Sequence, residues 1–426
     1  MKKTIKLAVV AALALGTTSA FATNGSNLIG LGAEARGMGG VGIGMAHGAE
    51  SGLANGALIT SVESTEISFG GTIFMPKVSN ENTLWDGVNP PFTSSEDSAA
   101  NMSVIPEVSI ASKVTDNFYM GVGMWGTAGM GVDYRDANSI MSGGAQMQMV
   151  TNLQLMQFGV PLAYKTSGLS LSITPVLQYG SLDINYEHPG QPNGLGGYII
   201  NPGTNYGTGV AQDLKFGYNL GASYEISGVT IGAVYKSQID MEYEGVMSKT
   251  VNAFSTTGTY ANDVLSTPAE MGIGASYTFS GNTIAIDYKR IKWSDAKGYQ
   301  DFEWEDQNVL ALGYQYATSD WAARVGYNYS KSPISEQTVV NPGTDVPNSA
   351  GLQPGTVNTF NLLGFPGIVE SHITVGGTYN VSKQTSVDLA YAYAPEVTNT
   401  YKNFAAQDIT TKHSQSSVSA QVNFKF

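Results

Sequence analysis

The sequence predicts an all-β protein, a 14-stranded antiparallel barrel that crosses a membrane and is plugged by its own N-terminal segment. Three features predict this fold. Apolar and polar residues alternate at period two along most of the chain, tight turns alternate with long loops, and a glycine-rich segment precedes the first strand. Period-two alternation places the apolar side chains of a strand on one face. The strands can therefore turn that face to lipid and close around the first segment.

The N-terminal 22 residues resemble a secretory signal peptide. Lys2, Lys3 and Lys6 precede an apolar run over residues 7–15, and small residues end the segment at Ala20-Phe21-Ala22. A positively charged start, a short apolar centre and an A-x-A end are typical of such signals. We therefore expect residues 1–22 to be cleaved on export, so that the mature chain starts near Thr23.

Composition excludes several classes of protein. The chain has no cysteine, and none of its four histidines stands at metal-ligand spacing from another. After the signal segment, no apolar run reaches the roughly 18 residues of a membrane-spanning helix. The net charge of −13 argues against nucleic-acid binding, because phosphate contacts need clustered lysine and arginine. We expect no cofactor, no metal and no nucleic-acid partner.

Residues 23–65 are the predicted plug, or hatch. They carry few long side chains and include seven glycines between Gly37 and Gly52. Such a segment can turn tightly and bring its backbone close to a wall, and a barrel this wide is not filled by wall side chains alone. Gly37, Gly39 and Gly42 formally spell the dinucleotide motif G-x-G-x-x-G. No apolar strand precedes them, so we reject a phosphate site.

The barrel is predicted over residues 66–426. Candidate strands lie near 66–76, 103–114, 117–125, 150–166, 168–187, 214–226, 228–240, 269–279, 281–293, 307–318, 320–331, 369–381, 383–394 and 415–426. Tight turns such as "KTSG" and "FSGN" alternate with long loops, as in an up-and-down barrel with both chain ends on one side. A sandwich with Greek-key crossings has no reason to sort its connections in this way. Closure of the barrel also leaves no unpaired edge.

The third candidate strand is interrupted by glycine. It reads "NFYMGVGMWGTAGMG" and contains Gly121, Gly123 and Gly126. Glycine inside a strand marks a bulge, a bend or a close approach of other backbone. Two interpretations remain at this stage: a bend in the wall, or small residues that face the plug.

Three long loops are rich in apolar residues. One contains Phe254 and Leu265, another runs over residues 198–200, and the third includes Phe360, Leu362 and Phe365. Loops that face water do not usually carry such residues. They predict either an apolar entry for a ligand or packing of the loops over the barrel mouth.

The stretch "NGSNLIGLGAEARGMGGVGIGMAHGAESGLANGALI" resembles the N-terminal hatch of the FadL/TodX family, outer-membrane channels for long-chain fatty acids and aromatic hydrocarbons. Similarity continues in "IAIDYKRIKWSD" and "VESHITVGGTYNVSKQTSVDLAYAYAP". The terminal Phe426 resembles the signal that the barrel-assembly machinery reads. The resemblance implies a plugged barrel in the bacterial outer membrane, in contact with lipid and lipopolysaccharide. We expect a monomer.

The resemblance also implies where a solute would pass. An inward kink at Gly121, Gly123 and Gly126 would open the barrel wall. The hatch gate would be formed by the residues Arg36, Gly39, Asn55, Gly56 and Ala57. The family hatch usually reads Asn-Pro-Ala where this chain has glycine at position 56. Glycine frees the φ angle that proline would fix, which suggests a more mobile or an engineered hatch.

We therefore expect passive uptake of a hydrophobic compound, a long-chain fatty acid or a related hydrocarbon. Capture by the apolar loops at Phe254, Leu265, Phe360, Leu362 and Phe365 would be followed by hatch rearrangement and lateral exit into lipid. Lateral exit keeps each methylene out of water, which is worth about 0.8 kcal/mol. The alternatives are uptake of monoaromatic hydrocarbons and a general porin for small polar solutes. A purely structural barrel or an adhesin also remains open.

A fatty acid would bring a carboxylate, which needs a cation when it is buried. The lumen-side candidates are Lys215, Lys236, Lys289, Arg324 and Arg36, each of which could instead pair with an acid of the wall. An enzyme is not expected. Ser371 and His372 are neighbours on one strand and so point to opposite faces.

Overall fold

The computed structural model describes residues 23–85, 90–192, 195, 197–254 and 260–426. The predicted signal peptide, residues 1–22, lies outside the described residues. The architecture is a closed 14-strand antiparallel barrel, as the sequence predicted. Its strands are β3 (Thr65–Leu84), β5 (Ser103–Lys113), β6 (Phe118–Asp133), β7 (Val150–Gly159) with β8 (Leu162–Thr166), β9 (Leu169–His188), β13 (Ala211–Ile226), β14 (Val229–Lys236), β17 (Glu270–Phe279), β18 (Asn282–Ile291), β19 (Gln307–Ala317), β20 (Trp321–Ser330), β21 (Ser371–Asn380), β22 (Thr385–Lys402) and β23 (Asp408–Lys425).

Each strand pairs with the next, and the last closes the barrel on the first. β23 pairs with β3 from Ile409 opposite Asn82 to Lys425 opposite Glu66. β7 and β8 are two parts of one wall strand, because both pair antiparallel with β9. Closure pairs the backbone groups along most of the wall, as a lipid surrounding requires.

The wall is apolar outside and polar inside. On β23, Val418 is 42% exposed, whereas its neighbours Ser417 and Ser419 are 1% exposed. Phe216 and Ile273 likewise point outward from the wall, at 81% and 63% exposure. A surface of this kind is stable only in an apolar surrounding. Among the described residues, no helix is both long enough and apolar enough to cross a membrane.

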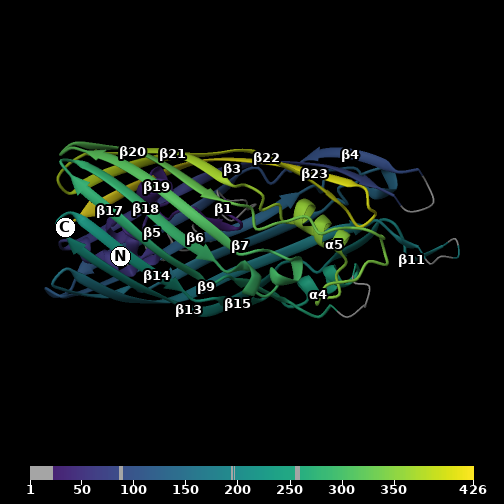
Figure 1. Cartoon of the computed structure of the whole chain (residues 1–426), viewed down its shortest axis with the longest axis horizontal. Coiled ribbons are helices and arrows are strands. Elements are labelled where there is room, and N and C mark those ends of the chain that lie inside the picture. The colour runs from purple at the N-terminus through teal and green to yellow at the C-terminus, as the bar shows by residue number, and fades with distance from the viewer. Residues whose placement is uncertain (1–22, 86–89, 193–194, 196, 255–259) are drawn as a thin grey trace, which may run out of the picture.

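The two ends of the barrel differ, as Figure 1 shows. The C-terminus and the short turns lie at one end, here called the turn end. Ser167-Gly168, Ser227-Gly228 and Ser280-Gly281 all have positive φ, the geometry of two-residue hairpin turns. The loops of the opposite end, here called the loop end, contain the helices α4 (Val246–Asn252) and α5 (Pro354–Thr359), the π-helical turn η6 (Phe360–Gly364), and the short strands β4 (Phe92–Asp97), β10 (Gln191–Pro192), β11 (Tyr198–Ile200), β12 (Thr204–Gly207), β15 (Ile239–Glu242) and β16 (Val264–Thr267). Figure 1 labels α4, α5, β4 and β11 toward this end.

The four largest differences from the predicted strand boundaries concern β3, β6, β22 and β23. β3 continues to Leu84, β22 continues to Lys402 and β23 starts at Asp408, where long loops were expected. These extensions lie at the loop end, and the outward side chains of "PEVTNTYK" are polar. The hydrophobic alternation that marks a strand in lipid therefore fades there. β6 also continues to Asp133, and nearly all its side chains after Gly123 are buried.

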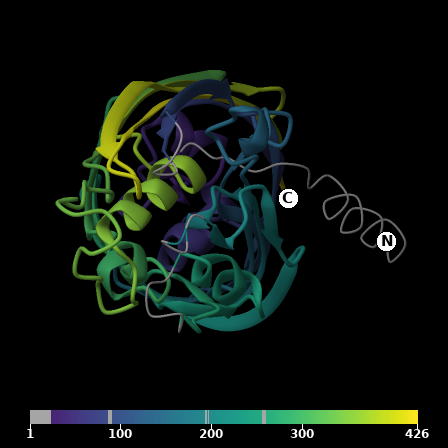
Figure 2. The same ribbon diagram turned by 90° about the vertical axis from the view of Figure 1, so that its right-hand side faces the viewer.

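The hatch lies inside the barrel at the turn end (Figures 1 and 2). Its elements are β1 (Thr23–Asn24), β2 (Asn27–Leu28), α2 (Ala33–Gly37), η1 (Gly48–Glu50), α3 (Ser51–Ala54) and η2 (Gly56–Ser61). Above it, loops of the other end fold inward and form the largest apolar cluster of the described residues, with Trp293, Phe302, Phe360 and Leu363. The lumen thus holds two layers, a hatch and an apolar loop layer.

Candidate functional site

A groove opens at the loop end between the long loops. It has a volume of about 1090 Å³ and is lined by Trp85, Phe92, His188, Phe254 and Phe404, among others. The lining comes from loops and strand ends that are far apart in sequence. A concave, largely apolar site of this size can hold a small hydrophobic molecule.

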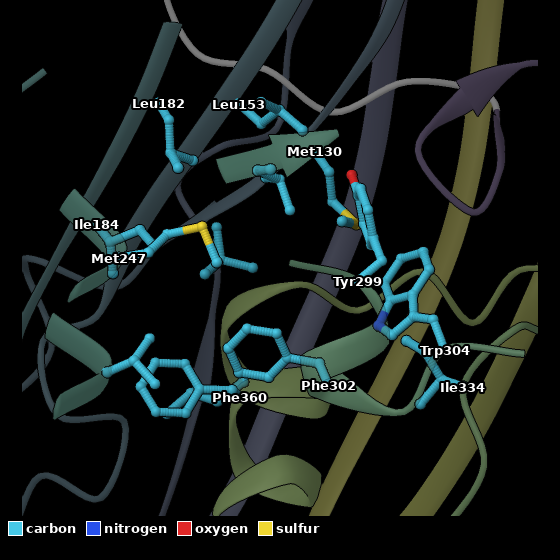
Figure 3. Packing of buried hydrophobic residues seen from close by; sticks show 14 of the residues in the cluster. Met130, Leu153, Leu182, Ile184, Met247, Tyr299, Phe302, Trp304, Ile334 and Phe360 are labelled. Atoms are coloured by element: carbon cyan, nitrogen blue, oxygen red, sulfur yellow. The ribbon is translucent and has the colours of Figure 1, made fainter. Parts of the chain in front are cut away.

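A row of aromatic rings leads inward from this groove. The ring centroids of His188 and Phe254 are 4.6 Å apart, those of Phe254 and Phe360 are 5.5 Å apart, and those of Phe360 and Phe302 are 5.7 Å apart. The last two rings lie side by side in Figure 3. These distances are those of packed aromatic pairs. The row therefore joins the groove to the apolar layer without an intervening charge.

The row ends at a small cavity of about 20 Å³. Leu182, Ile184 and Met247 line one side of it, and Phe302 and Trp304 line the other (Figure 3). Leu265, Tyr299, Asn361 and Phe365 complete the lining. The amide of Asn361 is satisfied, because it accepts from Trp304 Nε1 at 2.9 Å and donates to the Phe302 carbonyl at 2.9 Å. Apolar cavities of this kind stay dry.

The five predicted capture residues lie inside the mouth rather than on a surface that faces water. Leu265, Phe360 and Leu362 are 8%, 1% and 0% exposed, and Phe254 and Phe365 are half-buried. Of the two interpretations left open by the sequence, this burial matches packing of the loops over the barrel mouth, and the role of these residues in capture stays a prediction. The loops pack over one another because burying these side chains removes them from water. Phe254 lines the groove, whereas Leu265 and Phe365 line the inner cavity.

A second cavity of about 90 Å³ lies between the hatch and the wall. The hatch contributes Ile29, Leu31 and Ile43, and the wall contributes Lys236 and Lys289, among others. An engineered cavity of ~150 Å³ is known to bind benzene. This cavity is smaller, so a ring can enter only if the hatch or the wall moves.

Each of the five candidate cations is paired with an acid. The nitrogen–oxygen distances are 3.3 Å for Lys215 and Asp213, 2.9 Å for Lys236 and Glu270, 3.5 Å for Lys289 and Glu270, 3.0 Å for Arg324 and Glu34, and 2.5 Å for Arg36 and Glu107. A ligand carboxylate would have to compete with these acids. The pairs also include two that join the hatch to the wall.

The stronger of the two ion pairs between the hatch and the wall is that of Arg36 and Glu107. Its guanidinium donates two hydrogen bonds to Glu107, at 2.8 and 2.5 Å, and a third to the Thr72 hydroxyl at 2.7 Å. Arg36 and Glu107 are 2% and 3% exposed. A bidentate pair of this kind is strong and fixes geometry. Arg36, predicted as a gate residue, thus fastens the hatch to β5.

Glycines bring the hatch backbone against the wall backbone. Gly39 has a φ of +71°, and a Cβ on it would lie 2.7 Å from the backbone of Tyr327. A Cβ on wall residue Gly326 would lie 2.0 Å from the Gly39 nitrogen, and one on Gly44 would lie 2.4 Å from Gly274. Only glycine permits so close an approach. Glycines of the hatch therefore lie directly against glycines of the wall, where a side chain has no room.

The barrel wall is incomplete between β5 and β6. The two strands pair only from Glu107 opposite Trp125 to Lys113 opposite Tyr119. Beyond Trp125, β6 stays paired with β7, with a register shift between Gly126 and Ala128. Pro106, next to Glu107, has no N–H to donate to a ladder. β5 and β6 thus separate between this last pair and the loop end of the barrel.

Of the three glycines predicted at a wall opening, only Gly126 lies at the separation. Gly121 and Gly123 remain in the ladder, opposite Ala111 and Ser109. A Cβ on Gly123 would lie 2.1 Å from the Trp125 ring, so this glycine makes room for the indole. The sequence signal that could have located the separation was the proline at position 106, which was not among the predicted residues.

Comparison with known proteins identifies the family. A family model described as outer membrane protein transport protein (OMPP1/FadL/TodX) matches residues 7–349. The chain belongs to this FadL/TodX family. The family consists of transport channels rather than enzymes, and the chain is therefore assigned to the bacterial outer membrane.

Solved structures of similar fold include a Pseudomonas aeruginosa FadL homologue and the Pseudomonas putida toluene transporter TodX. The first is 13% identical with a TM-score of 0.71 and covers 94% of this chain and 100% of its own. The second is 17% identical with a TM-score of 0.64 and covers 93% and 99%. A 47 kDa outer membrane protein of Pasteurella multocida is 25% identical over 239 residues, and the chain spans about half the length of this curated relative.

The Asn-Gly-Ala sequence of this FadL/TodX family member packs tightly against the wall. Asn55 Nδ2 donates to the carbonyls of Ile43 and Ala222 at 2.8 and 3.1 Å, and Asn55 Oδ1 accepts from the N–H of Ala57 at 3.1 Å. A Cβ on Gly56 would lie 2.7 Å from Thr174 Oγ1. Close approach to β9 thus leaves little room for a side chain at position 56.

Asp287 is a hatch contact that was not predicted from the sequence. Its carboxylate, on β18, accepts from the N–H groups of Gly42, Ile43 and Gly44 at 2.7, 2.8 and 3.2 Å. Asp287 is 3% exposed, so these donors replace water. A lone acid on the inward face of an alternating strand was the available signal. It did not show which segment would supply the donors.

Two carboxyls of the hatch have opposite pKa shifts. Burial and the nearby Glu107 and Glu34 raise the pKa of Glu50 well above its ordinary value of 4.5, and its Oε2 has no hydrogen-bond partner in the described structure. Burial alone would also raise the pKa of Glu34, but Arg324 and His47 outweigh it and lower the value to about 2. Glu50 therefore opposes folding at neutral pH, whereas ionised Glu34 supports it.

Glu50→Gln is expected to stabilise the protein at pH 7 and to have no effect below about pH 4. The unfolded carboxyl ionises as the pH rises through about 4.3, while the folded one stays protonated, so wild-type stability is lost above that pH. Glutamine removes this loss. Melting temperatures of both proteins across this pH range would measure it. Glu34→Gln should instead destabilise the protein at pH 7, because it removes a carboxylate that supports folding. Equal pH profiles of the melting temperature for Glu50→Gln and wild type would contradict the assignment.

Proposed function

We propose that the protein takes up neutral hydrophobic compounds passively, from the loop-end groove to the membrane lipid. One observation carries the proposal: the uncharged path from the groove through Phe254, Phe360 and Phe302 to the inner cavity. A hydrophobic solute gains free energy by leaving water along such a path. The hatch and the separation of β5 from β6 lie beyond it. No energy source is part of the proposal.

The paired cations favour a neutral ligand over a fatty acid. A buried carboxylate needs a partner, and Lys215, Lys236, Lys289, Arg324 and Arg36 already have acids as partners. A monoaromatic or related hydrocarbon needs none. TodX of Pseudomonas putida, which is similar in fold, is described as a toluene transporter.

A long-chain fatty acid is the second candidate, and one observation favours it. Lys236 and Lys289 share the single acid Glu270 beside the hatch cavity. Asp287 also lines this cavity, but hatch N–H groups hold its carboxylate, so the two lysines could take up one further carboxylate. A general porin for polar solutes is disfavoured, because the hatch and the loop layer fill the lumen.

Uptake into proteoliposomes tests the proposal. Purified protein would be compared with empty liposomes for entry of toluene, palmitate and a small sugar. We expect faster entry of toluene and no change for the sugar. Entry of palmitate that falls in Lys236→Met/Lys289→Met would favour the second candidate. Sugar entry at porin rates, or no acceleration of either hydrophobic compound, would contradict the proposal.

The remaining partner assignments are also proposals. We propose insertion by the barrel-assembly machinery, with Phe426 as the exposed terminal aromatic at 68% exposure. We further propose a monomer surrounded by lipid and lipopolysaccharide. Light scattering of the detergent-solubilised protein would test the monomer.

A further inference from the structure

We propose that the outer face of β18, β19 and β20 binds a phosphate group of lipid A, the membrane anchor of lipopolysaccharide, through Arg290, Asn308 and Lys331. Lipid in general surrounds the barrel, whereas this site would hold one class of lipid by one chemical group. Three observations support it: the row that these residues form, its height on the wall, and the absence of a free acceptor in the row. The site does not depend on which solute the channel carries.

The three residues lie side by side on neighbouring strands. Arg290 on β18 is the register partner of Asn308 on β19. Lys331 directly follows β20, whose last pair joins Ser330 to Val309, so it continues the row of Asn308. All three side chains are exposed, whereas Val309 and Ser330 are buried. The row therefore faces away from the lumen. β18 and β20 lie about 10 Å apart, a distance that long side chains from both strands can close onto one phosphate.

The row stands at the border between the apolar belt of the wall and the loop end. Two residues closer to the turn end, Tyr288, Leu310 and Tyr329 form the next outward row on the same three strands. Tyr288 and Tyr329 point outward at 46% and 42% exposure. Outward tyrosines of this kind mark the membrane–water interface of a barrel, and the long loops lie outside the cell. The row thus lies at the head groups of the outer leaflet, where lipopolysaccharide has its phosphates.

The row presents hydrogen-bond donors and no free acceptor. The Tyr288 hydroxyl donates to Asn308 Oδ1 at 2.8 Å, which leaves the Nδ2 donor of Asn308 for another partner. Arg290 donates through Nε and Nη2 to Asp306 Oδ2 at 3.2 and 2.9 Å, while its Nη1 forms no hydrogen bond with the described residues. A guanidinium that is already held in place loses less freedom on binding, and arginine pairs strongly with phosphate.

The acids beside Arg290 already have cations. Asp306 Oδ2 also accepts from Lys292 Nζ at 2.5 Å, and Asp295 Oδ2 lies 3.2 Å from the same nitrogen. Arg290 and Lys292 thus balance these two carboxylates. Lys331 adds a third positive charge to the patch, and this charge is available to an external anion.

Lys331 has no acid within 4.0 Å in the described part of the chain. Glu370, on the segment that pairs with the end of β20, accepts instead from the Ser332 N–H at 3.1 Å, and Glu305 accepts from the Ser335 hydroxyl at 2.8 Å. Most described lysines and arginines do have an acid partner. An unpaired cation at the height of the head groups is therefore suited to a lipid phosphate.

The site lies far from the opening between β5 and β6. The paired strands run in the order β6, β7 with β8, β9, β13, β14, β17, β18 and β19. β19 is thus on the opposite side of the 14-strand barrel from β6. Bound lipopolysaccharide would leave the opening clear, so loss of the site should not change uptake.

Binding of lipid A to the detergent-solubilised protein tests the site. Native mass spectrometry would give the apparent dissociation constant in the presence of EDTA, which removes divalent ions that could bridge lipid to an acid. We expect Arg290→Gln/Lys331→Gln to bind lipid A at least about tenfold more weakly than wild type, because two cations are lost from a lipid-facing surface. Dephosphorylated lipid A should bind to wild type as weakly as lipid A binds to this variant.

Two further variants control for charge and for shape. Lys165→Gln/Lys383→Gln removes the same charge at the turn end and should bind lipid A like wild type. Asn308→Asp keeps the shape of the side chain but puts a carboxylate in the row, so it should weaken binding. All these variants should take up toluene into proteoliposomes at the wild-type rate, which shows that they are folded.

Each outcome bears on a stated claim. Equal affinity of wild type and Arg290→Gln/Lys331→Gln, or of lipid A with and without phosphate, would overturn the site. Binding that is lost in EDTA would put a divalent ion between protein and lipid and contradict direct contact. If phosphatidylglycerol or inorganic phosphate competes as well as lipid A does, the assignment to lipopolysaccharide is wrong. Failure of wild type to accelerate toluene entry would overturn the proposed function alone.

Discussion

Replacing Arg36 with methionine is expected to loosen the hatch and to turn a closed channel into one that conducts ions. The change leaves Glu107 buried at 3% exposure without its cation. Breaking a buried pair in this way costs about 3–5 kcal/mol, a large share of the ~5–15 kcal/mol that stabilises a typical fold. Single-channel recording in planar bilayers would detect the conductance, and thermal unfolding would measure the loss.

The double variant Arg36→Met/Glu107→Leu separates loss of charge from loss of the anchor. Removing both charges leaves nothing unpaired, and apolar replacements of buried pairs are often tolerated. We therefore expect it to be more stable than the single variant. Lys402→Met breaks the exposed pair with Asp408 and should change neither readout. An Arg36→Met channel that stays closed and melts like wild type would contradict the anchor.

Trp125→Ala is expected to destabilise the protein by about 3–5 kcal/mol and to widen the passage beside the opening. The indole is 1% exposed. Cβ atoms on Gly123, Gly159 and Gly52 would lie 2.1, 3.3 and 3.7 Å from its ring. The ring therefore lies between the wall and α3 of the hatch, where β5 and β6 separate. Its removal leaves a cavity between these parts.

Trp125→Phe provides the matched comparison. Trp125 Nε1 has no hydrogen-bond partner in the described structure, so loss of this donor removes no bond. Phenylalanine should keep most of the packing and remain closer to wild type in melting temperature. Uptake of naphthalene relative to toluene should rise in Trp125→Ala and stay nearly constant in Trp125→Phe. The same ratio in all three proteins would show that the indole does not limit the passage.

The barrel could be predicted because lipid imposes a simple rule on each strand. Outward residues such as Val418 must be apolar, inward ones such as Ser419 need not be, and tight turns require glycine or serine. Where the strands leave the lipid, as in the last part of β22, this rule no longer applies. The ends of β3, β22 and β23 were accordingly misplaced.

The contacts of the hatch could be predicted only in part. The wealth of glycine indicated close approach of backbones, but not that Gly39 would meet Gly326 or that Asp287 would receive three N–H groups. Such contacts join positions far apart in sequence, and period-two alternation contains no information on them. Arg36 was named as a candidate partner of a ligand carboxylate that could instead pair with an acid of the wall, and in the structure it pairs with Glu107.

The apolar loop residues were recognised, but their surroundings were not. Phe360 and Leu362 had to be buried or to bind something apolar, and the sequence could not distinguish the two. The structure buries both, in a lid that other loops complete. The neighbours come from distant loops, such as Phe302 and Phe254, whose positions depend on barrel closure.

The glycine-to-glycine contacts limit how hatches can be exchanged between related channels. Gly326 of the wall tolerates no side chain because Gly39 of the hatch lies against it, and Gly274 stands in the same relation to Gly44. A foreign hatch with bulkier residues there would be excluded from this barrel, and a foreign barrel would leave this hatch loosely held. A functional chimera must therefore take its hatch and its barrel wall from the same protein.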